Sequence, residues 1–451
     1  MKSTRILQTG TLALSLLAGS VMAAVTPEEA AQLGTSLTPL GAEMAGNADG
    51  SIPAWTGGHG PATGSADPRG FISDPFASDK PLFVITAENA EEHRDKLSAG
   101  QLAMFKRYPQ TYRMPVYQSH RSMSHPQSVY DTTKNCATAV SAIDGGNGLQ
   151  NYLDCRAYAF PIPKSGVEVV WNHMTRYRGQ NVRRQIVQAA PQTNGSFTLV
   201  KFEDEVAFPQ NVDGLDAEKA SNVLLFFKQR VTSPARLAGD VLLVHETIDQ
   251  VKEPRLAWLY NAGQRRVRRA PQVAYDAQGT AADGMRTTDN FDMFSGAPNR
   301  YDWKLIGKKE MYIPYNNVRL IQPDLKYGDI LKAGHINQDL TRYELHRVWE
   351  VEATLKDGER HIYAKRHMYF DEDSWQVALA DHYDGRGALW RVAEGHHYFD
   401  YSQQLASYAT AVLYDLIAGR YIANGMFNEE RQPLLFGFKA SAADFTPAAL
   451  R

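Results

Sequence analysis

The stretch LAWLYNAGQRRVRRAP, residues 256–271, decides the expected fold. Its first part alternates Leu256, Trp258 and Tyr260 with two other apolar residues, and this period of two is typical of a β-strand. Asn-Ala-Gly at 261–263 predicts a turn, after which four arginines follow in a short return segment. The stretch therefore predicts a β-hairpin with one apolar, aromatic strand and one cationic strand.

The cationic strand divides its charges between two faces. A period of two places Arg266 and Arg268 on the face opposite Val267. One interpretation is a solvated edge, where charge blocks edge-to-edge pairing of sheets. The other is a contact for an anionic head group or an acidic partner. In that case Trp258 and Tyr260 would contribute apolar wall to a binding site.

Length and composition bound the class of protein. The 451 residues are enough for two or three domains, or for one large β domain with extensions. A hydrophobic content of 43% and a charged content of 22% are typical of a globular protein with a sizeable core. The 48 Lys and Arg residues nearly balance the 50 Asp and Glu residues, which argues against nucleic acid as a partner.

The first 23 residues have the pattern of a signal peptide. Lys2 and Arg5 precede an apolar run at 12–18, and Val-Met-Ala at 21–23 is a small-residue cleavage site. A membrane anchor is the alternative, but the run is too short to span a bilayer. No cysteine follows the cleavage point directly, and no later run predicts a transmembrane segment. We expect cleavage after Ala23 and an exported, soluble mature chain.

The cysteine pair agrees with export. Cys136 and Cys155 are the only cysteines, and an oxidising compartment favours a disulfide between them. Such a bond would close a loop of about 20 residues and stabilise the fold by roughly 3 kcal/mol. A catalytic or metal-binding thiol pair is the alternative, but the spacing is not CxxC and histidines are not nearby.

Three regions follow the signal peptide. Residues 24–81 are rich in Gly, Pro, Ser and Asp, which predicts an extended segment across the body, pinned by Ile52 and Trp55. Residues 82–180 form a helical and loop region that includes the cysteines, and residues 181–451 form a β-sheet region that ends in a C-terminal helix or strand. Capping residues and periodicity predict helices over 87–97, 98–109 and 127–140.

The β-sheet region contains the clearest pattern. We expect strands over 183–189, 196–203, 223–231, 235–248 and 301–312, with a short helix beginning at Thr287 or Thr288. Between 342 and 399 the residues of one predicted face are Tyr343, Leu345, Trp349, Val351, Ala353 and Leu355. Asp-Gly turns at 357–358 and 384–385 separate the strands. This pattern predicts an antiparallel meander with one buried face.

Two arginines interrupt the apolar faces of that meander. Arg347 and Arg366 lie on adjacent predicted strands. They are either rim positions whose aliphatic stems cover apolar surface or polar contacts for a ligand inside a concave face. If they are ligand contacts, Trp349 would form part of the apolar wall of the same binding site. If Trp349 is buried in a sheet face, its replacement by alanine should cost about 3–5 kcal/mol.

Catalysis and cofactor binding often leave recognisable sequence motifs. The chain has no G-x-S-x-G, H-E-x-x-H or phosphate-binding glycine loop, so we predict no catalytic residues. Asn172 and His173 form a motif that we interpret as a hydrogen-bonded structural pair. A metal site could form from histidines of the meander, although scattered surface histidines are commoner, and we predict neither a metal nor a cofactor. These histidines are His361, His367, His382, His396 and His397.

Several motifs resemble a known family. The aromatic strand, short turn and R-x-V-R-R of the opening hairpin are similar to a signature of the LolA/LolB outer-membrane lipoprotein-sorting proteins. Together with FPIPKSGVEVVWNHMTRYRG (160–179), RVWEVEATLKDGERHIYAKRHMYFDEDSW (347–375) and the N-terminal segment, it resembles a family of uncharacterised exported Gram-negative proteins of about 450 residues. The resemblance covers nearly the whole mature chain. It implies a half-open curved β-sheet that holds acyl chains.

These observations define one fold and three functional hypotheses. The expected fold is mainly β with some α: a large, curved, half-open antiparallel sheet partly covered by helices and the extended N-terminal segment. The favoured function is non-enzymatic carriage of a hydrophobic or amphiphilic, lipid-like molecule through the periplasm, in exchange with an inner-membrane transporter or an outer-membrane protein. The alternatives are an exported enzyme acting on polysaccharide or lipid, and an envelope scaffold that binds no ligand.

Overall fold

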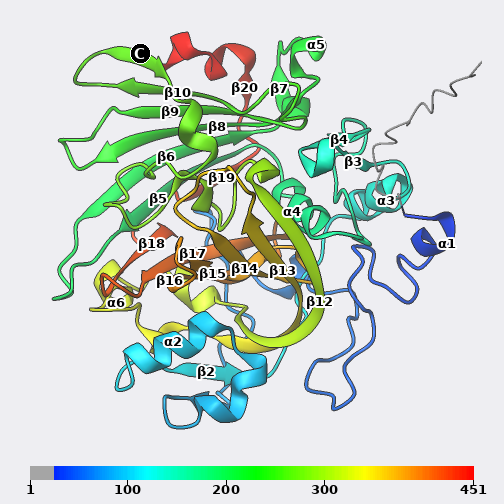
Figure 1. Ribbon diagram of the computed structural model, residues 1–451, viewed down its shortest axis with the longest axis vertical. Coiled ribbons are helices and arrows are strands. Elements are labelled where there is room, and N and C mark those ends of the chain that lie inside the picture. Colours follow the sequence, from blue (N-terminus) through cyan, green and yellow to red (C-terminus); the bar gives the residue numbers. More distant parts are fainter. Residues whose placement is uncertain (1–24) are drawn as a thin grey trace, which may run out of the picture.

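A computed structural model describes residues 25–451, so the predicted signal peptide lies outside the described residues. Within them, sixteen strands form one continuous sheet (Figure 1). Its order is β1 (Phe83–Ile85), β2 (Met114–Tyr117), β13 (Tyr343–Leu355), β14 (Lys365–Asp371), β15 (Val377–Tyr383), β16 (Leu389–Asp400), β17 (Leu405–Asp415), β18 (Arg420–Met426), β5 (Val182–Ala189), β6 (Leu199–Ala207), β8 (Val223–Ser233), β9 (Val241–Thr247), β10 (Leu256–Asn261) and β11 (Arg266–Arg269). Strand β12 (Tyr301–Pro314) also pairs with β13, and β19 (Leu434–Phe436) pairs with β5.

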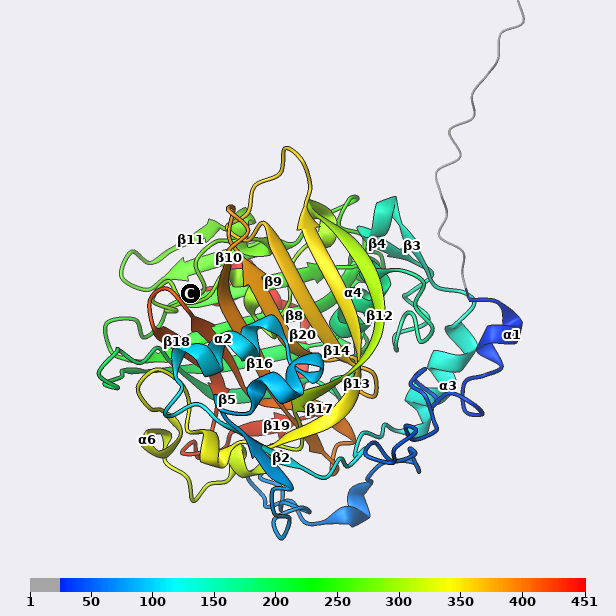
Figure 2. The same cartoon turned by 60° about the horizontal axis from the view of Figure 1, so that its bottom comes forward.

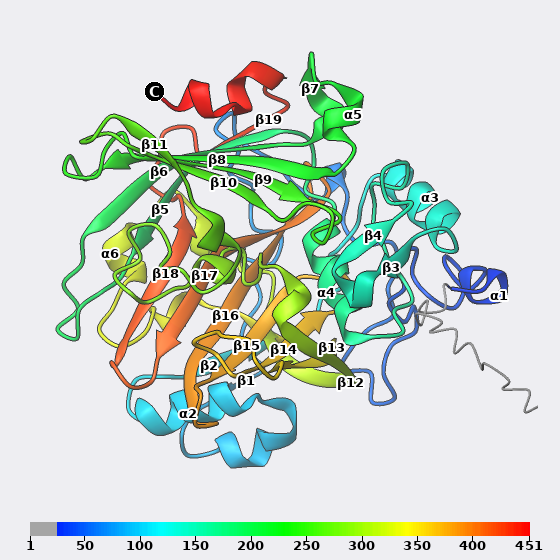
Figure 3. The same ribbon diagram turned by 45° about the horizontal axis from the view of Figure 1, so that its top comes forward.

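The sheet is curved and does not close into a barrel. Figure 3 shows β5–β11 above and β13–β18 below, with helix α4 (Gly166–Thr175) and loops between the two halves. Except for the parallel pair of β2 with β13, neighbouring strands of this sheet run antiparallel. The predicted fold is therefore confirmed, with the qualification that one parallel pair makes the sheet mixed. Two small sheets join β3 (Ser141–Ile143) to β4 (Gly148–Gln150) and β7 (Val212–Asp213) to β20 (Ala440–Ser441).

Helices lie beside the sheet as short elements. Besides α4, they are α1 (Pro27–Ala30), α2 (Ala99–Arg107), α3 (Gln127–Cys136), α5 (Ala217–Ala220) and α6 (Tyr327–Ile330). Ser98 caps α2 as predicted. Its side-chain oxygen accepts from the backbone N–H of Gln101, and the side-chain oxygen of Gln101 accepts from the backbone N–H of Ser98. The helix expected over 87–97 is instead a 3₁₀ helix, Ala90–Lys96. In the part of the chain described here, no helix is long and apolar enough to span a membrane.

Both faces of the central strands are buried, so the expectation of one buried face is wrong. Helix α2 covers one face of β15 and β16, and α4 packs against β12 and β13. The residues that alternate with the apolar positions of β13, such as Glu344 and His346, are also buried. Their polar groups are paired: Arg342 Nε donates to Glu344 Oε1 at 2.6 Å, and His346 Nε2 lies 3.0 Å from Glu344 Oε2. Paired polar groups can occupy a buried face that periodicity assigns to solvent.

The N-terminal segment is extended and lies along the outside of the sheet, as predicted (Figure 2). Ile52 is buried. The indole Nε1 of Trp55 donates to Met123 O at 2.9 Å. From the sheet, Trp375 Nε1 donates to Leu40 O at 3.0 Å and Arg347 Nη2 donates to Ala45 O at 3.1 Å. Side chains of the meander therefore hold the backbone of this segment in place.

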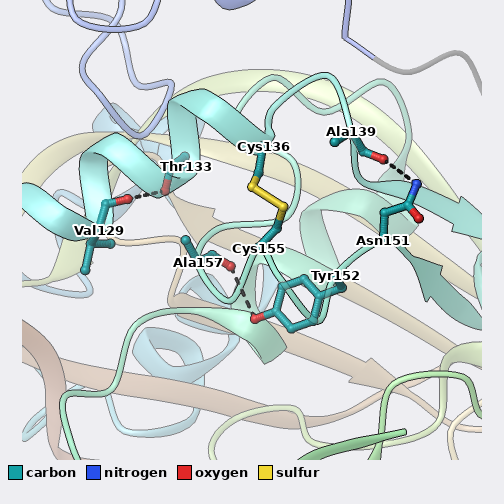
Figure 4. Close-up of a disulfide and its surroundings, with 8 residues drawn as sticks. All are labelled: Val129, Thr133, Cys136, Ala139, Asn151, Tyr152, Cys155 and Ala157. Atoms are coloured by element: carbon teal, nitrogen blue, oxygen red, sulfur yellow. Dashed lines mark hydrogen bonds between the residues drawn. A yellow bond between two sulfur atoms is a disulfide. The ribbon is translucent and has the colours of Figure 1, made fainter. Parts of the chain in front are cut away.

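The predicted disulfide between Cys136 and Cys155 is present (Figure 4). It joins the end of α3 to a loop that hydrogen bonds also restrain. The Asn151 side-chain amide donates to Ala139 O at 3.1 Å, and the Tyr152 hydroxyl donates to Ala157 O at 3.3 Å. The bond thus ties α3 to the irregular segment that leads towards α4.

Candidate ligand-binding cavity

A cavity of about 180 Å³ lies on the concave side of the sheet. Strands β5, β6, β8 and β9, helix α4 and the loop residues 273–295 contribute to its lining. Its volume is more than tenfold the roughly 10–15 Å³ that a single water needs. Aliphatic and aromatic side chains form much of the wall, namely Val182, Val206, Leu224, Leu225, Phe227, Leu242, Val244, Val273, Phe291 and Phe294.

Strand register explains why these side chains share one face. Directly paired residues of neighbouring strands point to the same side of a sheet. Val206 pairs with Phe227, Phe227 with Val244, and Val244 with Ala257. This row runs across four strands, and three of its members line the cavity. The neighbouring row, which includes Leu243, faces the opposite side.

Five arginines line the same cavity: Arg176, Arg178, Arg184, Arg255 and Arg286. Four of them contact carboxylates. Asp292 is shared by Arg176 at 2.6 Å and Arg178 at 3.1 Å, measured from guanidinium nitrogen to carboxylate oxygen. Arg184 Nη2 lies 3.0 Å from Asp204 Oδ2, and Arg255 pairs with Glu246. Five arginines therefore line the cavity, and four of them pair with three carboxylates.

Arg286 differs from the other four because no ion pair to it is found in residues 25–451. The whole residue is only 4% exposed. Its guanidinium nitrogens donate to Gln188 Oε1 at 3.3 Å and to Thr287 O at 3.5 Å. Burial lowers the pKa of the Arg286 guanidinium to about 10. In all five arginines, Nε is buried without a hydrogen-bond partner in the described structure. The cavity wall thus combines apolar side chains with five arginines.

The opening hairpin forms as predicted, but its aromatic residues face away from this cavity. Trp258 pairs with Leu243 and Tyr260 with Val267, and all four pack with the C-terminal segment that includes Phe445. Figure 1 shows this red C-terminal segment outside β10. Trp258 and Tyr260 do not line this cavity, so the prediction that they form the apolar wall of a binding site gains no support from it.

The two arginines selected from the hairpin lie at the edge of the sheet. Arg266 and Arg268 are exposed on β11, which is the last strand in the sheet order. As predicted, they lie opposite Val267, since they pair with Asn261 and Leu259. Arg268 Nη2 donates to Gln264 Oε1 at 3.0 Å. Contact of these arginines with a ligand or partner stays a prediction.

The other selected residues hold the fold together. Arg347 pairs with Glu372 at 3.2 Å, beside its bond to the N-terminal segment. Arg366 is fully buried and pairs with Asp289. Trp349 is half-buried and stacks on Trp375, with ring centroids 6.0 Å apart. None of Arg347, Arg366 and Trp349 lines the cavity. The rim interpretation of the two arginines is wrong, because both guanidiniums are buried in ion pairs.

The histidines named from the sequence are mostly buried rather than scattered on the surface. His382, His396 and His397 are fully buried, and the His361 side chain lies against Asp289, with Nε2 3.0 Å from Oδ2. Burial accounts for the fall of the pKa of His396 to about 3. The Asn172 side chain donates to and accepts from the backbone of Phe160, as expected for a structural residue.

One grouping of metal-type donors lies elsewhere. Ligand atoms of His346, Asp371 and Asp373 lie within 4.8 Å of one another. Burial, helped by the charge of Asp373, raises the pKa of Asp371 to about 7. Arg121 donates to both oxygens of Asp373 at 2.9 and 2.7 Å, and Ser374 donates to Asp371. Protein groups already satisfy most of these oxygens, so we interpret the cluster as structural.

The cavity arginines were missed in the sequence analysis. Arg176 and Arg178 precede the strand predicted over 183–189 and belong to a quoted motif, whereas Arg184 lies within that strand. Arg286 lies in an irregular loop, where no periodicity assigns a direction to a side chain. Helix α4 was also missing from the predicted helices. Its apolar residues Val167, Val170, Trp171 and Met174 have helical spacing, and this signal could have identified it.

The fold and cavity define a class of protein: an unclosed, curved β-sheet that encloses an apolar chamber with cationic groups. The chain belongs to the family described as "Protein of unknown function (DUF1329)", whose model matches residues 84–451. An uncharacterized protein of Pseudomonas aeruginosa is 65% identical over 452 residues, covering 100% of this chain and 99% of the relative. The resemblance to a family of uncharacterised proteins of about this length is thereby confirmed.

Two solved structures show partial similarity. A DUF1329 family protein from Desulfovibrio piger is 15% identical, with a TM-score of 0.41 over 61% of this chain and 92% of that one. A LolA superfamily protein from Nitrosomonas europaea is 11% identical, with a TM-score of 0.38 over 63% of this chain and 98% of that one. We draw no conclusion about binding from these two similarities.

Proposed function

We propose that this protein binds and carries a hydrophobic or amphiphilic, lipid-like molecule in its cavity. The observation that supports the proposal is an apolar chamber on the concave side of an unclosed sheet. Pockets that are mostly apolar with a few convergent polar groups are the usual form of small-molecule sites. The strands that form the wall are held by continuous pairing from β5 to β10, so the chamber is part of the fold.

The compartment and the partners belong to the same proposal. The signal-peptide pattern supports export to the periplasm. The exposed Arg266 and Arg268, at the free edge of the sheet, offer a cationic surface for an inner-membrane transporter or an outer-membrane protein. Exposed charges of one sign steer association with acidic partners. In this proposal the edge arginines contact the partner, and the cavity holds the cargo.

The decisive experiment is mass spectrometry of organic extracts from protein purified without unfolding from its native compartment. A stoichiometric amphiphile would support carriage, whereas protein that is empty and also fails to bind an added apolar probe would refute it. N-phenyl-1-naphthylamine is a suitable uncharged probe, because its fluorescence rises in apolar surroundings.

A matched pair of variants assigns binding to the cavity. Val244→Trp places a large ring in the chamber, since Val244 lines it. Val84→Trp is the control, because Val84 is 37% exposed and does not line the cavity. We expect only Val244→Trp to abolish probe binding. Equal binding by both variants would place the probe outside the cavity.

A further inference from the structure

The charge of the cavity wall is unbalanced, and this imbalance points to the chemistry of the cargo. An apolar chamber alone would suit a neutral hydrocarbon. Here Arg286 is buried without an ion pair in the described residues, and Arg178 shares Asp292 with Arg176. A buried charge is costly unless it is paired and hydrogen-bonded. An anion in the cavity would satisfy these groups.

We propose that Arg178, Arg184 and Arg286 bind the anionic head group of an amphiphile whose tail lies on the apolar wall of the cavity. This inference rests on the proposed function and adds to it the class of the head group, a carboxylate or a phosphate. Guanidinium groups suit both anions, because their planar donors match the spacing of two anionic oxygens.

The placement of these three arginines is consistent with a single polar end of the cavity. Arg184 and Gln188 are four residues apart on β5 and therefore share a face of that strand, and Gln188 Oε1 accepts a hydrogen bond from Arg286 at 3.3 Å. The charge of Arg184 acts on Arg178, where it adds to the effect of burial in lowering the pKa of that guanidinium to about 10. All three side chains line the chamber, and Arg184 lies on the same face of β5 as Gln188, the hydrogen-bond partner of Arg286.

The carboxylates nearby do not neutralise these cations fully. Asp204, the partner of Arg184, is completely buried, and burial raises its pKa. One of its oxygens already accepts a hydrogen bond from Gln229 at 3.0 Å. The buried Nε groups of Arg178, Arg184 and Arg286 also have no partner in the described structure. The Arg178 and Arg184 side chains remain 24% and 28% exposed, so a head group with several oxygens can contact them.

Displacement of N-phenyl-1-naphthylamine by three twelve-carbon competitors tests this inference. Dodecanoate, dodecyl phosphate and 1-dodecanol have the same tail and differ in the head. We expect at least one anion to displace the probe at about tenfold lower concentration than 1-dodecanol, since a charge-assisted hydrogen bond is stronger than a neutral one. The tighter anion would identify the head group as carboxylate or phosphate.

Two variants assign the preference to the arginines. Arg184→Gln/Arg286→Gln removes two cavity charges, and Arg386→Gln/Arg431→Gln removes two exposed ones as the control. We expect the cavity variant to lose the preference for anions while it keeps its affinity for 1-dodecanol, and the control to keep both. The single variant Arg286→Gln is used if the double variant does not fold, because Arg286 has no ion pair to lose.

The outcomes separate this inference from the proposed function. Equal displacement by all three competitors would overturn the anionic head group and leave carriage intact. A preference that persists in the folded cavity variants would overturn the role of these arginines. Failure of the wild-type protein to bind the probe or any competitor would overturn both proposals.

Discussion

Replacing Glu394 by glutamine should change how stability depends on pH. Glu394 lies on β16 and is fully buried. The hydroxyls of Tyr112 and Tyr343 donate to its two oxygens, each at 3.1 Å. Burial nevertheless raises the pKa of Glu394 from an ordinary value of 4.5 to about 7. Glutamine keeps the shape and an acceptor oxygen but removes the titration.

The direction of the pH effect follows from which state, folded or unfolded, binds the proton of Glu394 more tightly. Because the folded state has the higher pKa, it retains the proton between pH 4.5 and about 7, while the unfolded state loses it. Glu394 therefore favours folding below pH 4.5, and its contribution declines as pH rises towards about 7. A difference of about 2.5 pKa units corresponds to about 3 kcal/mol at roughly 1.4 kcal/mol per unit.

Urea unfolding at pH 4.5, 6 and 8 measures this contribution. The free energy of unfolding of Glu394→Gln, relative to wild type, should rise by about 3 kcal/mol across this range. The exposed Glu88, replaced by glutamine, is the matched control, and its relative stability should stay constant. A constant or falling difference for Glu394→Gln would show that the buried group does not titrate as its surroundings indicate.

Three further outcomes are expected. Trp349→Ala should cost about 2–4 kcal/mol in denaturant melts, because the ring is only half-buried but stacks on Trp375; a loss below about 1 kcal/mol would contradict that packing. Thiol labelling of the denatured, unreduced protein should find no free Cys136 or Cys155, and two reactive thiols would contradict the disulfide. Arg266→Gln/Arg268→Gln should change stability by less than about 1 kcal/mol per charge while weakening salt-sensitive partner binding. Unfolding of this variant would contradict the exposed-edge assignment, whereas unchanged partner binding at low salt would contradict the proposed partner contact.

Local periodicity predicts the strands well where alternation is strong. The hairpin was expected from residues 256–271, and the observed pairing of Tyr260 with Val267 places the arginines on the predicted faces. Strands β5, β8 and β12 also lie within a few residues of their predicted ranges. In these segments the local pattern and the tertiary environment agree, so period and turn residues suffice.

The concave side could not be derived in the same way. Alternation shows that Trp258 and Ala257 face opposite sides, but it cannot show which side the sheet curves around. The apolar size of Trp258 favoured the concave side, but in the structure Trp258 packs in a second core with Phe445 of the C-terminal segment. The cavity arginines come from four different segments, and only the curvature of the sheet brings them together.

The bonds between the N-terminal segment and the meander also govern how the chain folds. Leu40 and Trp375, joined by a hydrogen bond, are 335 residues apart in sequence, and Ala45 and Arg347, also joined by a hydrogen bond, are 302 apart. Such high contact order slows folding, because long loops must close before the contacts that reward closure form. During synthesis the N-terminal part of the chain emerges first. Ile52 therefore lacks its final packing partners until the last third of the chain has been made. During that interval the unfinished chain exposes apolar surface and is prone to aggregation.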